Sequence, residues 1–291
     1  MSKRNDWLAI MTIVLMMVTS VTGILSWNLS CSYEITNLYG QTVKMYGYGL
    51  YSYDTYFQAP ISIGTDICIL FLVVPIFVYT YINYCRKKDK LSELKLISMY
   101  AVAFYYAASL VLGLTYNQLF LEYLALFACS IFGMFMHIKK IEWSGCASIT
   151  RGGKVFLYIC GLALVVAWLP DVIPSIIRGT TLSLIGVYTT CITYVLDMGI
   201  ISPLCFVCIY LMKKGDALGT MLMAIMMKLC MVVGVMMIPQ GICQLLSGYN
   251  IPLPAFITKS MSFVLLGGSA FYFDKKLYRE LENVLTEDEK N

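Results

Sequence analysis

Long apolar runs alternate with short polar segments along almost the whole chain. Each run is about 20 residues long, the length of helix that crosses the hydrocarbon core of a bilayer. The runs lie at residues 7–27, 61–84, 96–115, 118–138, 154–177, 192–212, 219–246 and 254–274. The pattern therefore predicts an all-α integral membrane protein with about eight transmembrane helices. Pro170 and Pro174 interrupt the fifth run and predict that its helix breaks near the outer end.

Composition agrees with lipid as the main surroundings of this chain. Of its 291 residues, 59% are hydrophobic and 13% are charged, whereas soluble domains carry roughly 25% charged residues. The mean hydropathy is +0.74. The longest polar stretch, residues 28–60, is too short to form a separate domain and is expected to rest on the helices beside it.

Basic residues mark one side of the predicted membrane. Every second connection between the apolar runs carries lysines and arginines, whereas the other connections carry few, such as Lys44 and Arg178. By the positive-inside rule the basic side is cytoplasmic, and an even number of crossings places both termini there. The basic residues form no continuous face, so no nucleic-acid partner is expected. The clusters are Lys3–Arg4, Arg86–Lys88, Lys139–Lys140, Lys213–Lys214 and Lys275–Lys276.

The external segment 28–60 is rich in tyrosine and in residues that favour β-structure. Two β-prone stretches flank a turn at Gly40-Gln41, which predicts a small hairpin lying against the helix ends. Its tyrosines are typical of an interfacial aromatic belt, and they could also form a stacking platform for a sugar or a peptide. The candidates for such a platform are Tyr46, Tyr48, Tyr51 and Tyr53.

The two halves of the chain share a pattern. In each half, the second apolar run enters from outside, carries an aspartate and then a proline: Asp66 with Pro75, and Asp197 with Pro203. A unit of four spans repeats in parallel orientation, because four is an even number. We therefore expect one four-helix repeat at 1–139, a second at 140–274, and a charged cytoplasmic tail at 275–291.

Several stretches resemble a widespread family of bacterial multi-pass membrane proteins of uncharacterised activity. The resemblance rests on Tyr46–Tyr51, on Gly64-Thr65-Asp66 with Pro75, on Tyr116–Phe127 and on Val195–Pro203. It implies a location in the bacterial cytoplasmic membrane, and it brings no activity with it.

Charged side chains inside apolar runs are the strongest candidates for a site, because each is costly in lipid unless it is paired or hydrated. Asp66, Glu122, Asp197 and Lys228 meet this description. Counting from the cytoplasmic turn at Lys213-Lys214 puts Asp197 and Lys228 at similar depths, since each residue adds 1.5 Å along a helix. The count predicts a buried ion pair between them, which either fixes helix packing or belongs to a ligand site.

The same count places Asp66 opposite Tyr116 and Asn117, with Glu122 nearby. The two carboxyl groups could share a proton, bind a cation or face water. Alternatively, Asp66 caps its helix and accepts a hydrogen bond from Tyr116 or Asn117.

Other chemistry finds little support in the sequence. The two aspartates lack the surrounding motifs of intramembrane aspartyl proteases, and the Cys205–Cys208 pair in an apolar run is typical of packing. His137 is the single histidine and lies at a helix end, where a cap or interface role is expected. No catalytic residue, metal site or cofactor is therefore assigned.

Three hypotheses remain for function. The first is a transporter or small-ligand-binding membrane protein, with a polar site between the repeats that also uses Tyr105 and Tyr106. The second is a non-catalytic accessory protein that binds a membrane partner through the external loop. The third is an intramembrane enzyme. A cavity that holds the aspartates favours the first, and a tightly packed bundle favours the second.

Overall fold

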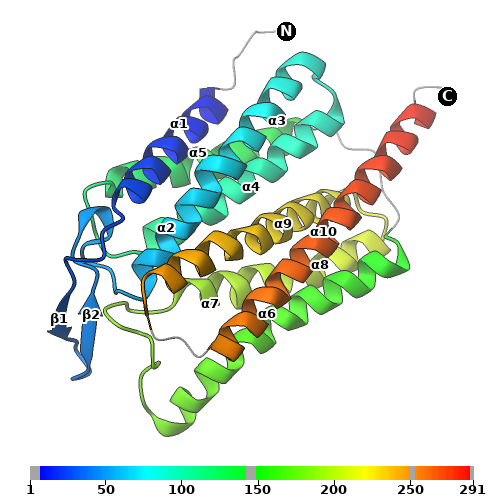
Figure 1. Ribbon diagram of the computed structural model, residues 1–291. Coiled ribbons are helices and arrows are strands. Elements are labelled where there is room, and N and C mark those ends of the chain that lie inside the picture. Colours follow the sequence, from blue (N-terminus) through cyan, green and yellow to red (C-terminus); the bar gives the residue numbers. More distant parts are fainter. Residues whose placement is uncertain (1–6, 142–148, 250–252, 289–291) are drawn as a thin grey trace.

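The computed structural model describes residues 7–141, 149–249 and 253–288. It is a bundle of long helices that run side by side, with a small two-stranded sheet at one end (Figure 1). The start of α1 (Trp7–Leu25) and the end of α10 (Leu253–Asp288), where the described chain begins and ends, lie at the opposite end of the bundle (Figure 1). The expected all-α architecture with a small β-structured loop is confirmed at this level.

Within the described residues, seven helices are long and apolar enough to cross a membrane. The eighth expected crossing, 254–274, falls on α10 (Leu253–Asp288), which packs along α9 and is not among these seven. The seven spans are α1 (Trp7–Leu25), Gln58–Lys87, α4 (Lys90–Gly113), α5 (Phe120–Lys140), α6 (Arg151–Arg178), Ile192–Lys213 and α9 (Ala217–Leu246).

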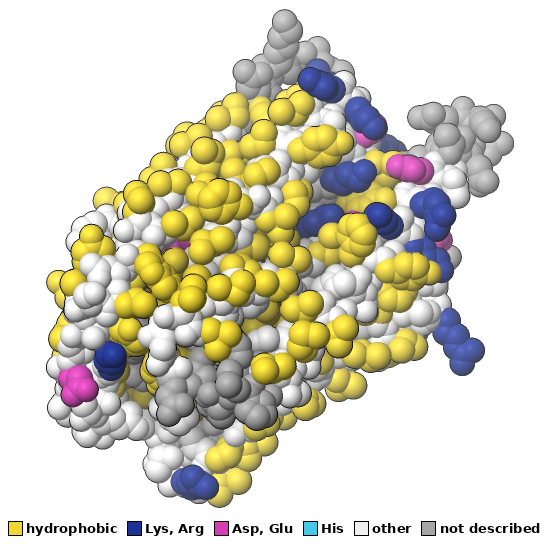
Figure 2. Space-filling model, in the orientation of Figure 1, with side chains coloured by type: hydrophobic (Ala, Val, Ile, Leu, Met, Phe, Trp, Pro, Cys, Tyr) yellow, Lys and Arg dark blue, Asp and Glu magenta, His cyan; other side chains and the backbone are white. Residues whose placement is uncertain are grey.

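The surface has the pattern of a membrane protein. Hydrophobic side chains cover most of the visible sides of the bundle, and lysines and arginines gather at the end that holds the termini (Figure 2). Few basic side chains are visible at the end that holds the sheet (Figure 2). The chain is therefore a membrane-embedded, multi-pass helical protein.

Two of the spans contain a π-helical turn, and in both a proline follows it closely. Gln58–Lys87 consists of α2 (Gln58–Cys68), the π-turn η2 (Ile69–Val73) and α3 (Val74–Lys87). Ile192–Lys213 consists of α7 (Ile192–Leu196), the π-turn η3 (Asp197–Ile201) and α8 (Ser202–Lys213). In each case a proline is the second residue after the π-turn. Proline has no N–H and its ring clashes with the carbonyl four residues earlier, so the wider turn relieves the clash.

Helix α6 differs from its expected form. The sequence predicts a break at Pro170 and Pro174, yet the helix continues through both to Arg178. It ends at Gly179, which adopts the left-handed conformation that closes many helices. The tail is also more than a charged extension, because α10 runs on to Asp288 and buries Leu277, Tyr278 and Leu281.

The external hairpin forms as expected. Strands β1 (Tyr33–Thr36) and β2 (Thr42–Met45) pair antiparallel, from Tyr33 opposite Met45 to Thr36 opposite Thr42. Asn37 organises the turn, because its side-chain oxygen accepts from the Tyr39 and Gln41 N–H groups. Gly40 adopts a positive φ of 75°, which glycine tolerates. The short 3-10 helix η1 (Gly49–Tyr51) follows the hairpin.

The tyrosines of this loop do not form one platform. Tyr46 and Tyr51 are fully buried, whereas Tyr48 and Tyr53 are exposed. Tyr46 fixes the loop to α1: its hydroxyl donates to the Ser26 carbonyl oxygen at 3.0 Å and accepts from the Asn28 N–H. The predicted set of four stacking tyrosines is therefore wrong for Tyr46 and Tyr51, whose rings are needed to pack the loop.

The centre of the bundle is built from α4 and α9, which pack against each other. Helix α2 of the first half packs on α9, and α7 of the second half packs on α4. The span with the π-turn in each half therefore packs on the central helix of the other half. Polar side chains meet along these contacts, Gln240 with Thr65 and Tyr105 with Asp197.

Candidate functional site

A cavity of about 300 Å³ lies between the two halves. This volume is at the lower end of the roughly 300–1,000 Å³ range of ligand pockets. Its walls come from α2, α4, α6, α7, α9 and α10, together with the loop that joins α6 to α7. Among its polar lining residues are Thr65, Tyr105, Trp168, Tyr188, Tyr194, Asp197, Gln240, Gln244 and Ser260.

Asp197 is the buried carboxyl group of this cavity. It is 2% exposed, and it is the first residue of the π-turn η3. Its Oδ2 accepts from the Trp168 indole N–H at 3.0 Å, and its Oδ1 accepts from the Tyr105 hydroxyl at 3.3 Å. Because Trp168 belongs to α6 and Tyr105 to α4, three helices from both halves meet at this carboxylate.

The opposite part of the cavity offers amide and hydroxyl groups. Gln240 of α9 donates from Nε2 to the Thr65 hydroxyl of α2 at 2.8 Å, which links the halves. Gln244 Nε2 and Ser260 Oγ are buried and have no hydrogen-bond partner among the described residues. A buried donor without a partner costs about 1–3 kcal/mol, so both groups suit a polar ligand in the cavity.

Lys228 is not the partner of Asp197. Its Nζ pairs with Asp274 Oδ2 of α10 at 3.0 Å, so the predicted Asp197–Lys228 ion pair is wrong. Lys228 precedes Val233, a cavity residue of α9, by five positions, which is roughly 140° around the helix. This rotation turns Lys228 away from the cavity and toward α10.

Asp66 is fully buried outside the cavity lining. Its Oδ1 accepts from the Tyr106 hydroxyl at 2.6 Å, and its Oδ2 accepts from the Tyr51 hydroxyl. A Cβ on Gly23 of α1 would lie 1.8 Å from Oδ2, so the contact depends on glycine there. Adjacent tyrosines of α4 thus each serve one aspartate, Tyr106 for Asp66 and Tyr105 for Asp197.

The partners predicted for Asp66 lie elsewhere. Tyr116 is 76% exposed, and its ring lies at a tilt against the Phe120 ring, 5.3 Å between centroids. Asn117 acts at the start of α5, where its side-chain oxygen accepts from the Leu119 N–H at 3.0 Å. Both expected contacts with Asp66 are therefore wrong, because these residues turn toward α5.

Glu122 has a hydroxyl donor of its own. The Thr19 hydroxyl of α1 donates to its carboxylate, at 2.7 Å from Oε1. No hydrogen bond joins the carboxyl groups of Glu122 and Asp66 in the described part of the chain. The sharing of one proton between them thus stays a prediction without a contact that supports it.

Sequence reasoning missed Asp54, which ties the outer loops together. This side chain is fully buried, and its Oδ1 accepts from the Thr115 N–H at 3.0 Å and from the Tyr188 hydroxyl at 2.9 Å. The hairpin loop, the connection between α4 and α5 and the loop before α7 therefore meet above the cavity. In the sequence, Asp54 is one polar residue in a polar loop, so only its burial reveals it.

The stability of the outer loops should depend on pH through Asp54. Burial raises the pKa of this carboxyl from 3.8 to about 6, against the opposing hydrogen bonds from Thr115 and Tyr188. The pKa of Asp54 is higher in the folded state than in the unfolded state. Asp54 therefore contributes most to the free energy of unfolding below pH 3.8, and this contribution is lost as the pH rises through about 6. Between about pH 4 and about pH 7 we expect a loss on the order of 2 kcal/mol in the free energy of unfolding.

Denaturant unfolding in detergent at several pH values gives the slope of the free energy of unfolding against pH. Asp54→Asn should remove it, because the amide cannot titrate and still accepts from Thr115. Asp216→Asn, an exposed cap of α9, should keep it. The assignment to Asp54 is wrong if Asp54→Asn keeps the wild-type slope.

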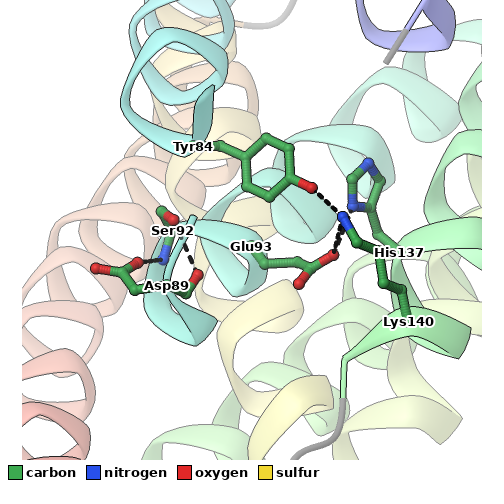
Figure 3. Close-up of polar contacts among 6 residues, drawn as sticks. All are labelled: Tyr84, Asp89, Ser92, Glu93, His137 and Lys140. Atoms are coloured by element: carbon green, nitrogen blue, oxygen red, sulfur yellow. Dashed lines mark hydrogen bonds and ion pairs between the residues drawn. The ribbon is translucent and has the colours of Figure 1, made fainter. Parts of the chain in front are cut away.

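A second polar cluster lies at the end of the bundle that holds the termini, where α3, α4 and α5 meet. His137 Nδ1 lies 2.9 Å from Glu93 Oε1, and Lys140 Nζ lies 3.5 Å from the same oxygen (Figure 3). Lys140 also donates to the Tyr84 hydroxyl. His137 is 5% exposed and joins α5 to α4, which is the interface role that its place at a helix end predicts.

No family model, curated protein or solved structure matches the chain. The class that the fold defines is a multi-pass helical membrane protein with a cavity between its two halves.

Proposed function

We propose that this protein binds a small molecule in the cavity between its halves, as a transporter or as a ligand-binding membrane protein. The observation that carries the proposal is a cavity of about 300 Å³ that holds a buried carboxylate, Asp197. Intramembrane carboxylates that face a cavity mark ligand and ion pathways in membrane proteins. Gln244 and Ser260 add buried polar groups that a ligand would satisfy.

The arrangement of the helices supports two parallel four-helix repeats, at 1–139 and 140–274. Val74 donates its N–H to the Ile69 carbonyl, and Ser202 donates to the Asp197 carbonyl, so the two π-turns have the same hydrogen bond. The reciprocal packing of α2 on α9 and α7 on α4 is what a two-fold axis along the membrane normal requires. Transport sites commonly lie at such an interface, where helices depart from regular geometry.

Matching the two π-turns changes the relation between the aspartates. When Pro75 is matched to Pro203, Asp197 corresponds to Ile69 and Asp66 corresponds to Tyr194. The two carboxylates therefore occupy different turns of the repeat. This difference agrees with the cavity, which includes Asp197 and leaves Asp66 out.

The proposed location is the bacterial cytoplasmic membrane with both termini in the cytoplasm. The basic end in Figure 2 and the positive-inside rule support this orientation, and the resemblance noted above supports the bacterial membrane. In this orientation the cavity and the hairpin lie toward the external face.

The second candidate function is a non-catalytic accessory protein that binds a membrane partner through the external loop. Leu38, at the tip of the hairpin, is 99% exposed, and the next residue, Tyr39, is exposed as well. Such a tip suits contact with another protein or with lipid. The third hypothesis, an intramembrane enzyme, has no pair of carboxyl groups to support it among these contacts, because Asp66 and Asp197 accept hydrogen bonds from different donors.

A cavity-filling variant tests the ligand-binding proposal. Ser109 of α4 lines the cavity, and Ser109→Phe places an aromatic ring in it. A ligand at about 100 times its Kd stabilises the wild-type protein by about 2.7 kcal/mol, and we expect the variant to lose most of this gain. Thermal unfolding during a screen of small metabolites provides the measurement.

Leu112→Phe is the matched control, because Leu112 lies on the same helix and is 59% exposed. It should keep the ligand effect. The proposal fails if no compound stabilises the wild-type protein, or if every compound that does so stabilises Ser109→Phe equally. Uptake of a confirmed ligand into proteoliposomes then distinguishes a transporter from a binding protein.

A further inference from the structure

We infer that the ligand of this cavity is a largely apolar molecule with a carbonyl group, as in a ketone, an ester or an amide, whose oxygen accepts hydrogen bonds from Gln244 and Ser260. The inference rests on the proposed function, because it names the chemical class of ligand for the same cavity.

Gln244 supplies the first donor. It lines the cavity from α9 and is 5% exposed, and its Nε2 has no hydrogen-bond partner within the described structure. Buried amide groups are almost always hydrogen-bonded in folded proteins. An unpartnered amide N–H at the wall of a cavity therefore indicates an acceptor that enters through the cavity.

Ser260 supplies the second donor from the neighbouring helix, α10. Its Oγ is buried without a partner among the described residues, and it lines the same cavity. Helices α9 and α10 run antiparallel, side by side (Figure 1), and Gly234 of α9 lies against the backbone of Phe263 and Gly267. Counting from that contact along both helices places Ser260 level with about Gln240, which is one helical turn from Gln244.

The two donors lean toward each other. Side chains on a helix tilt toward the N-terminal end of that helix. Because α9 and α10 are antiparallel, Gln244 tilts toward the level of Ser260, and Ser260 tilts toward the level of Gln244. An amide N–H and a hydroxyl that approach from two helices match the two lone pairs of one carbonyl oxygen. A ligand hydroxyl would bring a further donor to this pair of donors.

The rest of the ligand is expected to be apolar. On α9, Val233, Met236 and Met237 line the cavity with the spacing of one helix face, and Gln244 follows farther along the helix. Leu110 of α4 adds an apolar side chain from another wall. Methionine side chains are flexible and adapt to the shape of what they contact. The cavity thus combines an apolar wall with a donor pair at one end.

Three probes of equal heavy-atom count test the inference on the purified full chain in a non-ionic detergent. They are benzophenone, diphenylmethanol and 1,1-diphenylethylene, which carry a carbonyl oxygen, a hydroxyl and a methylene group at the same position. The dose dependence of thermal unfolding gives their dissociation constants. We expect the ketone to bind at least about tenfold more tightly than the hydrocarbon and about threefold more tightly than the alcohol.

Two variants locate the donors. Gln244→Met keeps the unbranched shape and removes the N–H groups, and Ser260→Ala removes the hydroxyl. Each should reduce the preference for the ketone over the hydrocarbon by at least about threefold, because one hydrogen bond is lost. Comparing the preference between wild type and variant cancels the different partitioning of the probes into micelles.

Gln118→Met and Ser262→Ala are the matched controls, since both residues are exposed and lie outside the cavity lining. They should keep the wild-type preference. The preference among the three probes on the unmodified chain decides the question even where Gln244→Met fails to fold.

Three results would overturn the inference, and they differ in what they say of the proposed function. If the hydrocarbon or the alcohol binds as tightly as the ketone and Ser109→Phe abolishes that binding, the carbonyl class is wrong and the ligand cavity stands. The same holds if the preference for the ketone persists in both Gln244→Met and Ser260→Ala, because the donors then lie elsewhere. If no probe binds, the carbonyl class is wrong as well, and the proposed function then falls only when the metabolite screen also finds nothing.

Discussion

Replacing Lys228 by methionine should lower the free energy of unfolding by about 3–5 kcal/mol, because it leaves the buried Asp274 carboxylate without its ammonium partner. The two side chains meet at 3.0 Å, and they are only 16% and 10% exposed. Methionine keeps the unbranched shape of the lysine stem, so the loss reports the charge and not a cavity.

A double-mutant cycle in detergent, measured by denaturant unfolding, isolates the pair. Lys228→Met with Asp274→Leu should recover most of the loss, because both charges are then absent. Lys213→Met removes an exposed lysine and should change stability by less than about 0.5 kcal/mol. If Asp197→Asn rescued Lys228→Met and Asp274→Leu did not, Lys228 would pair with Asp197 in solution and the helix rotation described above would be wrong.

Lys228 also shows which part of this fold can be predicted from sequence. Hydropathy and charge place the spans, and the rise of 1.5 Å per residue gives each side chain a depth. Neither gives the rotation of a helix about its own axis, which depends on the neighbours that it packs against. In the sequence, Asp274 is the last residue of the eighth apolar run, at its cytoplasmic end, so the depth count placed no carboxyl of that run opposite Lys228.

The sequence predicts that tyrosines donate hydrogen bonds to the buried aspartates, but it identifies only some of the residues that do so. Tyrosines beside buried carboxylates were expected, and Tyr105 and Tyr106 fill that role. Tyr51 and Trp168 were missed for different reasons. Tyr51 comes from the external loop, which folds back onto the helices, and Trp168 lies on a helix that was expected to break two residues later. Long-range packing decides both positions, and no periodicity in the sequence reports it.

The contact between α2 and α9 joins the halves, and Gly64→Val should weaken it by about 3 kcal/mol. A Cβ at Gly64 would lie 2.5 Å from the Gln240 Cα and 2.6 Å from its backbone nitrogen. Backbone atoms cannot move aside as a flexible side chain can, so α2 must separate from α9. Both helices line the cavity, and Gln240 bonds to Thr65, so ligand binding should weaken together with stability.

Gly268→Val provides the matched control for Gly64→Val, since a Cβ at Gly268 of α10 meets nothing within 4 Å. Valine forms helix slightly better than glycine, so this variant should match or exceed wild-type stability by up to about 0.5 kcal/mol. Unfolding of both variants in detergent gives the comparison. Equal stability of the two would mean that α2 and α9 do not touch at Gly64. The cavity, whose walls depend on that contact, would then need a different arrangement of the halves.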